Sequence, residues 1–249
     1  MIKEEQLNAI AALKRLSPKN AEKEYFQEMI LYTLASAAGK DLVFKGGTCL
    51  YKIYKINRFS EDLDFDAEKT DIEKIIKKAL YGIKLLDINC SIKYIDKYEN
   101  AINVGINFNG PLYDGSKDSL CFLLINFSLR QKAVLQPKLE RIYTVYKEFP
   151  DFDVYAMDLK EILAEKVAAI HNRNKPRDVY DLWFLLTRLS VEFDRSLIKK
   201  KIKRQFGRTI FMKKILEKEG YWKGELGRLI IGHLPSFKEI KSAIESLVK

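Results

Sequence analysis

The sequence contains few of the residues on which several common kinds of protein site depend. Its 249 residues include three cysteines and two histidines. Cys49, Cys90 and Cys121 are widely separated, and neither a Cys-x-x-Cys pair nor a histidine cluster accompanies them. This spacing supports neither a disulfide framework nor a structural zinc site. Two isolated histidines also give no basis for nucleophilic catalysis by a Ser-His-Asp or Cys-His arrangement.

Long apolar runs are missing as well. No stretch approaches the roughly 18 uninterrupted apolar residues that a membrane-spanning helix needs, so we expect no membrane partner. Charged residues run through the first 20 positions, which predicts that they form no signal peptide. The sequence is nevertheless 47% hydrophobic and 12% aromatic, enough to bury a sizeable core and to exclude disorder as the dominant state. We therefore expect a soluble, cytoplasmic globular protein.

The excess of positive charge is confined to one end of the chain. The formal net charge is +10, and residues 195–249 contain 15 basic and 5 acidic side chains, whereas residues 1–194 contain 29 of each. This asymmetry indicates a surface for a polyanion such as nucleic acid, although a solvated lysine-rich surface gives the same pattern. The predicted nucleic-acid-binding residues lie within six positions: Lys199, Lys200, Lys201, Lys203 and Arg204.

The hydrophobic periodicity changes near residue 157. Strand-like stretches occur only before that point, with one or two more expected between 134 and 157; they are 41–44, 61–67, 85–96, 101–109 and 119–130. Helical patterns occupy 3–16, 18–38, 49–56 and 70–83 before that point and 158–172, 176–189, 195–205, 208–219 and 237–248 after it. Regular βαβ alternation is absent. We predict an α+β fold, with a mixed β-sheet flanked by helices in domain 1–157 and a helical bundle in domain 158–249.

The strongest candidate for chemistry is the acidic stretch EDLDFDA at 61–67. Its acidic residues alternate with apolar ones, so on a strand the carboxylates of Asp62 and Asp64 lie on one face, with Cα atoms roughly 6.5–7 Å apart. Two such carboxylates can bind a divalent cation together with substrate phosphates, as in nucleotidyl transfer. Asp66 extends the row. The polar face of an edge strand would show the same alternation, so the motif needs support from elsewhere.

A pair of glycines provides that support. Lys45, Gly46, Gly47 and Thr48 lie between a predicted strand and a predicted helix, some 15 residues before the acidic stretch. Glycines there allow backbone N–H groups to approach an anion, while Lys45 and Thr48 offer a charge and a hydroxyl to it. The spacing is not that of a Walker A motif, and alone it indicates only a tight turn. Together with the acidic strand it predicts a phosphate-binding turn that faces a metal site.

Two segments carry a family resemblance. KGGTCLYKIYKINRFSEDLDFD, at 45–66, resembles the signature of the AbiEii/AbiGii-type nucleotidyltransferase toxins of the DNA polymerase β-like nucleotidyltransferase superfamily, and AEKVAAIHNRNKPRDVYDLWFLL, at 164–186, resembles their helical motif. The resemblance covers about residues 24–190. It implies a nucleotidyltransferase fold and the transfer of a nucleoside monophosphate from an NTP to an acceptor, with Mg²⁺ or Mn²⁺ as cofactor.

The resemblance also implies roles for individual residues. Asp62 and Asp64 would bind the metal, and Lys166 would reach the triphosphate; these three form the implied catalytic set. The implied nucleotide-binding residues are Lys45, Gly46, Gly47, Thr48, Arg58, Ser60, Asp178 and Asp181. Arg173 and Arg177 would contact phosphate or pair with the aspartates of their helix. Without the resemblance, Lys166 would be assigned to the exposed side of an amphipathic helix and the aspartates to surface ion pairs.

One position departs from the family pattern. Where the family often has a third carboxylate on a later strand, this sequence has Asn126, which cannot act as a base. Three interpretations stay open: Asp66 or Asp178 compensates, the alignment is shifted by a few residues, or the activity is reduced.

The resemblance implies the toxin of a toxin–antitoxin or abortive-infection system, with a separately encoded antitoxin. Together with the basic C-terminal tract it makes RNA, at the 3′ end of tRNA as in related toxins, the expected acceptor. Two alternatives remain: a nucleotide-binding module without catalytic activity, and a nucleic-acid-binding protein that acts through the basic bundle alone. A protein acceptor would be a further alternative to RNA.

Overall fold

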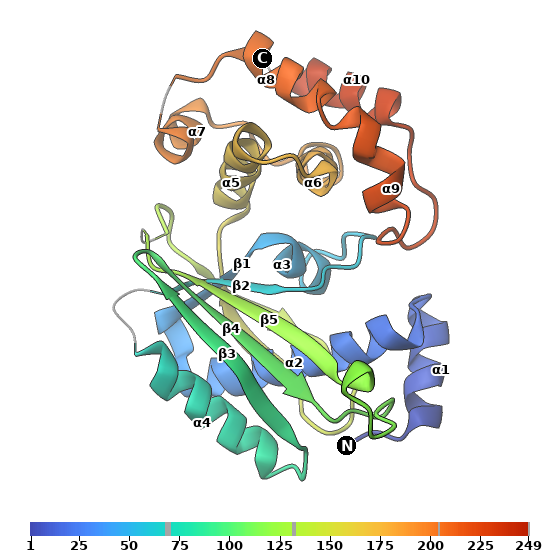
Figure 1. Cartoon of the computed structure of the whole chain (residues 1–249). Helices are drawn as coiled ribbons and strands as arrows, with labels where there is room; N and C mark the ends of the chain where they lie inside the picture. Colours follow the sequence, from blue (N-terminus) through green and yellow to red (C-terminus); the bar gives the residue numbers. More distant parts are fainter. Residues whose placement is uncertain (68–70, 131–132, 204, 249) are drawn as a thin grey trace. The chain divides into compact units, whose positions relative to one another are not determined.

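The computed structural model of the chain describes residues 1–67, 71–130, 133–203 and 205–248. These residues form two compact units (Figure 1). The first unit comprises Met1–Tyr54, Ser60–Ala133 and Pro137–Ala156, and the second comprises Lys55–Phe59, Val134–Gln136 and Met157–Lys249. The predicted division at residue 157 separates the last strand from the helices that follow, but it does not anticipate that two short earlier segments join those helices.

A mixed sheet forms the centre of the first unit. Its seven described strands lie in the order β3-β4-β5-β2-β1-β7-β6. β2 is antiparallel to β1 and parallel to β5, and β1 is parallel to β7. The strands are β1 (Leu42–Lys45), β2 (Leu63–Ala67), β3 (Cys90–Tyr98), β4 (Ala101–Phe108), β5 (Cys121–Ser128), β6 (Lys138–Ile142) and β7 (Phe152–Ala156). The predicted fold class, a mixed sheet flanked by helices and followed by further helices, is confirmed.

Helices cover both faces of this sheet. They are α1 (Glu4–Lys14), α2 (Pro18–Ala38), α3 (Gly46–Lys52) and α4 (Ile72–Lys84). α2 begins where sequence predicts it, because the Ser17 hydroxyl accepts a hydrogen bond from Asn20 N at 3.2 Å and Pro18 fits the first turn. Figure 1 shows α2 and α4 on the face of the sheet opposite α3. The apolar residues of β2 therefore face α2, and its acidic residues face α3.

The second unit is helical. It contains α5 (Leu159–Asn172), α6 (Pro176–Thr187), α7 (Arg195–Ile202), α8 (Arg208–Leu216), α9 (Trp222–Leu226) and α10 (Phe237–Leu247). The segment Lys55–Phe59 is bound to it by backbone hydrogen bonds from Phe59 N to Leu229 O and from Ile231 N to Asn57 O, each 2.8 Å long. Among the described residues, no helix is both long and apolar enough to cross a membrane.

Three local predictions need correction. The strand predicted at 85–96 begins at Cys90, because α4 runs into a turn in which Asp87 adopts φ +55°. α9 lies between the predicted helices 208–219 and 237–248, where the sequence predicts no helix. The predicted turn at 45–48 is instead the start of a helix, because α3 already begins at Gly46.

Candidate functional site

The acidic row lies where the pattern predicts it. Asp64 and Asp66 belong to β2 and Asp62 immediately precedes it, while Leu63 and Phe65 are buried in the core. Asp62 and Asp64 are both partly accessible to solvent, whereas Asp66 is 6% exposed. Alternation along the strand has therefore placed the carboxylates on the face away from the core.

Helix α3 contacts the acidic row at two points. Thr48 donates a hydrogen bond from Oγ1 to the backbone carbonyl of Asp62. Gly46 has φ +75°, and a Cβ atom built on it would lie 2.6 Å from Asp64 Oδ2. Sequence reasoning assigned this glycine to phosphate binding. The structure shows a second reason for it, since any side chain would collide with a candidate metal ligand.

Asn126 lies directly beside the candidate metal ligands. It is the partner of Asp64 in the parallel pairing of β2 with β5, and its Nδ2 donates to Asp64 Oδ1 at 3.0 Å. The third position of the site thus offers an amide. Both predicted substitutes for a third carboxylate are already engaged: Asp66 lies 2.6 Å from Lys45 Nζ, and Asp178 forms ion pairs in the second unit.

The donor set fits a hard divalent cation. Asp62 and Asp64 supply carboxylate oxygens, and Mg²⁺ is usually held by one or two carboxylates with the remaining positions filled by water and substrate phosphates. In the part of the chain that the structure describes, no group of three or more His, Cys, Asp or Glu side chains could hold a metal.

The second unit contains a separate cluster of buried charges. Arg58 binds Asp181 in bidentate fashion, with Nε–Oδ1 2.8 Å and Nη2–Oδ2 2.9 Å. Lys166 Nζ lies 2.7 Å from Asp181 Oδ2 and 3.1 Å from Asp178 Oδ1. Arg173 completes the cluster with bonds of 2.7 and 2.8 Å to Asp178. The cluster ties α5, α6 and the segment Lys55–Phe59 together.

Desolvation and ion pairing act in opposite directions on these groups. Burial by itself raises the pKa of Asp178, but Lys166 and Arg173 outweigh it and hold that pKa at about 2. Burial also raises the pKa of Asp181, but the charges of Arg58 and Lys166 outweigh it and lower that pKa below its usual value. Burial works against the charged form of Lys166, yet the two aspartates raise its pKa. All three side chains are therefore charged at neutral pH.

The sequence was compared with known protein families and with curated proteins. The sequence matches the profile of the family described as nucleotidyl transferase AbiEii toxin, type IV toxin–antitoxin system, over residues 30–242. The chain belongs to this AbiEii family. It is thus a nucleotidyltransferase, and the family implies an NTP substrate and a separate antitoxin. Among curated proteins, none matches the sequence significantly.

Solved structures share the fold of this AbiEii-family chain. The nucleotidyltransferase toxin MenT4 of Mycobacterium tuberculosis is 18% identical, with a TM-score of 0.68 over 99% of this chain and 88% of that one. JHP933 of Helicobacter pylori is 20% identical, with a TM-score of 0.62 over 93% and 91% of the two chains. A further H. pylori protein, described as a putative nucleotidyltransferase, is 21% identical, with a TM-score of 0.59 over 93% and 94%.

The predicted site residues of the AbiEii-family chain are divided between the two units, and the structure brings them together within each unit. Gly46, Gly47 and Thr48 share the first turn of α3 beside the acidic row. Ser60 lies just before that row, and its carbonyl accepts a hydrogen bond of 2.8 Å from Gln27 Nε2. The remaining predicted residues, Arg58, Lys166, Asp178 and Asp181, lie together in the second unit.

Burial corrects part of the picture that helical spacing suggested. Lys166 is 6% exposed and both aspartates are fully buried, so none of them belongs to an exposed helix face. Arg177 forms an ion pair with Glu225, with 3.7 Å between Nε and Oε1.

The residues of the basic tract differ in their exposure to solvent. Lys199, Lys200 and Lys203 are exposed. Lys201 is 8% exposed at its side chain and lies 2.6 Å from Glu161 and 3.0 Å from Glu165. It therefore holds α7 against α5. Arg204 lies outside the described residues.

Replacing Gly46 tests its contact with the acidic row. We expect Gly46→Ala to displace the Asp64 carboxylate and to lower the rate of nucleotidyl transfer at least about tenfold, because misplacement of a catalytic group by a fraction of an ångström is costly. The measurement is the initial rate at saturating NTP. Gly115→Ala is the matched control, since Gly115 also has a positive φ, +98°, but no atom lies within 4 Å of its would-be Cβ. Equal rates for both variants would contradict the assignment.

Acid unfolding tests the buried cluster. Because the pKa of Asp178 in the folded protein is about 2 and that of an unfolded aspartate is about 3.9, its stabilising contribution is complete above pH 4 and is lost as the pH falls toward 2. We expect Asp178→Asn to cost about 3–5 kcal/mol at pH 6 and progressively less between pH 4 and pH 2.

Urea denaturation followed by tryptophan fluorescence measures this, because both tryptophans, Trp183 and Trp222, lie in the second unit. Asp118→Asn, at an exposed position of the first unit, is the control. A pH-independent difference between Asp178→Asn and wild type would show that the charge of Asp178 does not stabilise the fold.

Proposed function

We propose that the protein transfers a nucleoside monophosphate from an NTP to RNA, at the 3′ end of tRNA, with a divalent cation held by Asp62 and Asp64. The observation that carries the proposal is the position of these two carboxylates on one face of β2, beside the first turn of α3. A carboxylate pair next to glycine N–H groups suits a nucleotide whose phosphates share the cation. NTP and tRNA as substrates make the cytoplasm the expected place of action.

The residues of the first unit would divide the work. Asp62 and Asp64 would hold Mg²⁺ or Mn²⁺, which when bound neutralises charge on the phosphates. Gly46 and Gly47 would offer backbone N–H groups to the triphosphate. Thr48 fixes the backbone of Asp62, and Lys45 balances the charge of Asp66. Lys45 and Thr48 thus support the acidic row as well as the nucleotide that the resemblance assigns to them.

Asn126 would stabilise rather than react. Its amide donates to Asp64 Oδ1 at 3.0 Å, which fixes the orientation of that carboxylate. An amide has no basic site that could remove a proton from an acceptor hydroxyl. Proton removal in this proposal therefore falls to a carboxylate of the pair or to solvent.

The second unit would supply cations. Arg173 is half exposed at its side chain and is the member of the buried cluster that a phosphate can reach most easily. Direct contact of Lys166 with the triphosphate, as the resemblance implies, would require phosphate to replace one of its two aspartates. Arg58, Asp178 and Asp181 then act by fixing the helices around it, and Ser60 by its backbone.

The exposed part of the basic tract supports RNA as the acceptor. Lys199, Lys200 and Lys203 extend from α7 and its end into solvent, and lysines so placed contact phosphates without reading bases. In this proposal Lys201 contributes by holding α7 in place rather than by touching RNA.

A labelling reaction tests the proposal. Purified protein is incubated with Mg²⁺, total bacterial RNA and each α-³²P-labelled NTP in turn. We expect label in a discrete RNA band of tRNA size, and a loss of at least about 1,000-fold in the Asp62→Ala/Asp64→Ala variant, because the ion can no longer be held. The labelled NTP identifies the base.

Each other outcome selects a different function. Label that enters protein and survives ribonuclease would indicate a protein acceptor. NTP binding by calorimetry without any labelled product would favour the catalytically inactive module. RNA binding that is unaffected by Mg²⁺ and by the double substitution would favour action through the basic tract alone.

Restoring the third carboxylate gives an independent prediction. Asn126→Asp removes the amide donor and places a third negative charge beside Asp64. We therefore expect its Tm to fall by about 2–4 °C in EDTA, the equivalent of about 1 kcal/mol, and to recover or exceed that of wild type in Mg²⁺. Thermal unfolding in both buffers measures this, with Asn126→Ala as the control without the added charge. If Mg²⁺ leaves the Tm difference unchanged, Asp64 does not lie at the metal site.

A further inference from the structure

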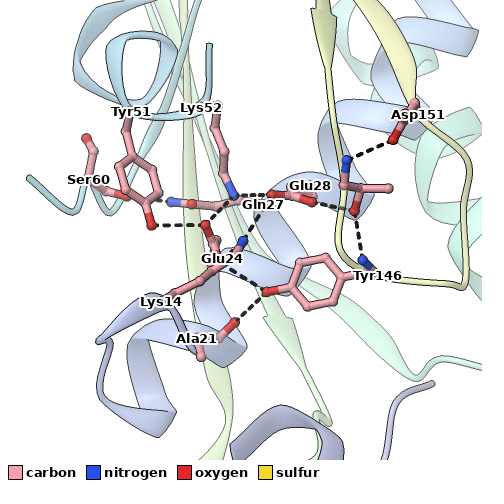
Figure 2. Close-up of polar contacts among 11 residues, drawn as sticks. Lys14, Ala21, Glu24, Gln27, Glu28, Tyr51, Lys52, Ser60, Tyr146 and Asp151 are labelled. Carbon is pink, nitrogen blue, oxygen red and sulfur yellow. Dashed lines mark hydrogen bonds and ion pairs between the residues drawn. The ribbon is translucent and has the colours of Figure 1, made fainter. Parts of the chain in front are cut away.

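Three polar side chains on one face of α2 are buried. Glu24 and Glu28 are each 2% exposed and Gln27 is fully buried. Their spacing of three and four residues places them side by side on the helix. Figure 2 shows them directed toward α3 and toward the segment before β2. Sequence reasoning missed this group because α2 is buried on more than one side, with half of its other residues buried too, so no separate polar face is visible in the sequence.

The polar face of α2 holds the acidic site from two directions. Lys52, the last residue of α3, places Nζ 2.7 Å from Glu28 Oε1 and 3.1 Å from Glu24 Oε1 (Figure 2). Its neighbour Tyr51 donates to Glu24 Oε1 at 3.0 Å. Gln27 donates to the carbonyl of Ser60, two residues before Asp62. One helix therefore fixes both α3 and the entry to β2.

The two glutamates are themselves held from the other side. Glu24 Oε2 accepts from Lys14 at 2.8 Å and from Tyr146 at 3.1 Å, and Glu28 Oε2 accepts from Thr144 at 2.7 Å. Burial opposes ionisation of Glu24, but Lys52 and Lys14 lower its pKa to about 2, so it is charged at neutral pH. Each carboxylate thus has donors from more than one element, and neither can turn away from α3.

We infer that Glu24 and Glu28 are positioning residues for the metal-binding aspartates and act through Lys52 and α3. The path is short. Lys52 lies one helical turn from Thr48, which holds the backbone of Asp62, and α3 begins with Gly46, which packs against Asp64. The inference rests on the proposed function, in which Asp62 and Asp64 hold the cation.

The buried ion pairs of Lys52 are better explained by the positioning of α3 than by a gain in stability. Replacing a buried ion pair with apolar residues of similar size is often neutral or stabilising, so stability alone does not explain the arrangement. Charged hydrogen bonds are directional and short, and Lys52 reaches two carboxylates on successive turns of α2. This arrangement restricts both sliding and rotation of α3, which apolar contacts restrict less.

A charge-neutral pair of substitutions tests the inference. Lys52→Met leaves two buried carboxylates with too few cations, whereas Glu28→Gln/Lys52→Met removes one charge of each sign and leaves the pair of Glu24 with Lys14. The double variant should therefore be more stable than Lys52→Met alone while still lacking the Lys52 link between α2 and α3; the bond of Tyr51 to Glu24 stays in place. Ile83→Ala is the matched control, because it opens a cavity in the same unit, at a fully buried position on α4.

Hydrogen–deuterium exchange reports on position directly. We expect residues 46–52 and 62–66 to exchange at least roughly tenfold faster in the double variant than in Ile83→Ala, because the link that keeps them closed is lost. If the double variant regains both the stability and the wild-type exchange of these segments, the ion pair is merely structural and the inference is wrong.

Mn²⁺ binding, measured by electron paramagnetic resonance, reports on the site. We expect it to weaken about tenfold in the double variant and to remain unchanged in Ile83→Ala. Unchanged Mn²⁺ binding in the double variant, against a loss in Asp62→Ala/Asp64→Ala, would also overturn the inference. If Asp62→Ala/Asp64→Ala binds Mn²⁺ like wild type, the proposed metal site fails instead, and the exchange result still decides whether Glu24 and Glu28 position α3.

Discussion

Carboxylates gathered on one strand repel one another, and the first unit depends on how that repulsion is offset. Each of the three aspartates in the acidic row forms a hydrogen bond or an ion pair with a different element. Thr48 of α3 holds the backbone of Asp62, Asn126 of β5 donates to Asp64, and Lys45 of β1 pairs with Asp66. Asp66 is thus paired with a cation, and Asp62 and Asp64 are the two carboxylates that the proposed function assigns to the ligand.

The same principle organises the second unit, with a different result. There three cations, Arg58, Lys166 and Arg173, pair with two buried aspartates, so both carboxylates are compensated within the cluster. Arg58 belongs to the second unit, whereas the first unit resumes at Ser60, two residues before Asp62. A single motif of nine residues, RFSEDLDFD, therefore contributes its arginine to one unit and its aspartates to the other.

Local patterns in the sequence predicted the elements and the acidic row because both arise from neighbouring residues. Period-two alternation placed Asp62 and Asp64 on one face, and Ser17-Pro18 placed the start of α2. The pairings that decide what the polar residues do join distant positions: Arg58 with Asp181, or Glu24 with Lys52. Helical spacing alone suggested surface ion pairs for Asp178 and Asp181, and only the packing of α5 against α6 shows that they are buried.

Asn126 places an amide where a third carboxylate would add both a cation ligand and a negative charge. A third carboxylate beside Asp64 would strengthen cation binding and provide a base, but without a cation it would add repulsion to a strand held largely in the core. The amide avoids that repulsion and fixes the Asp64 carboxylate by a hydrogen bond. The acidic row can therefore fold in a fixed geometry before any ion binds, with α3 and α2 rather than the ion keeping the two carboxylates in place. In the proposed function such a site is preorganised by the protein, and the cation would take its remaining ligands from the nucleotide and from water.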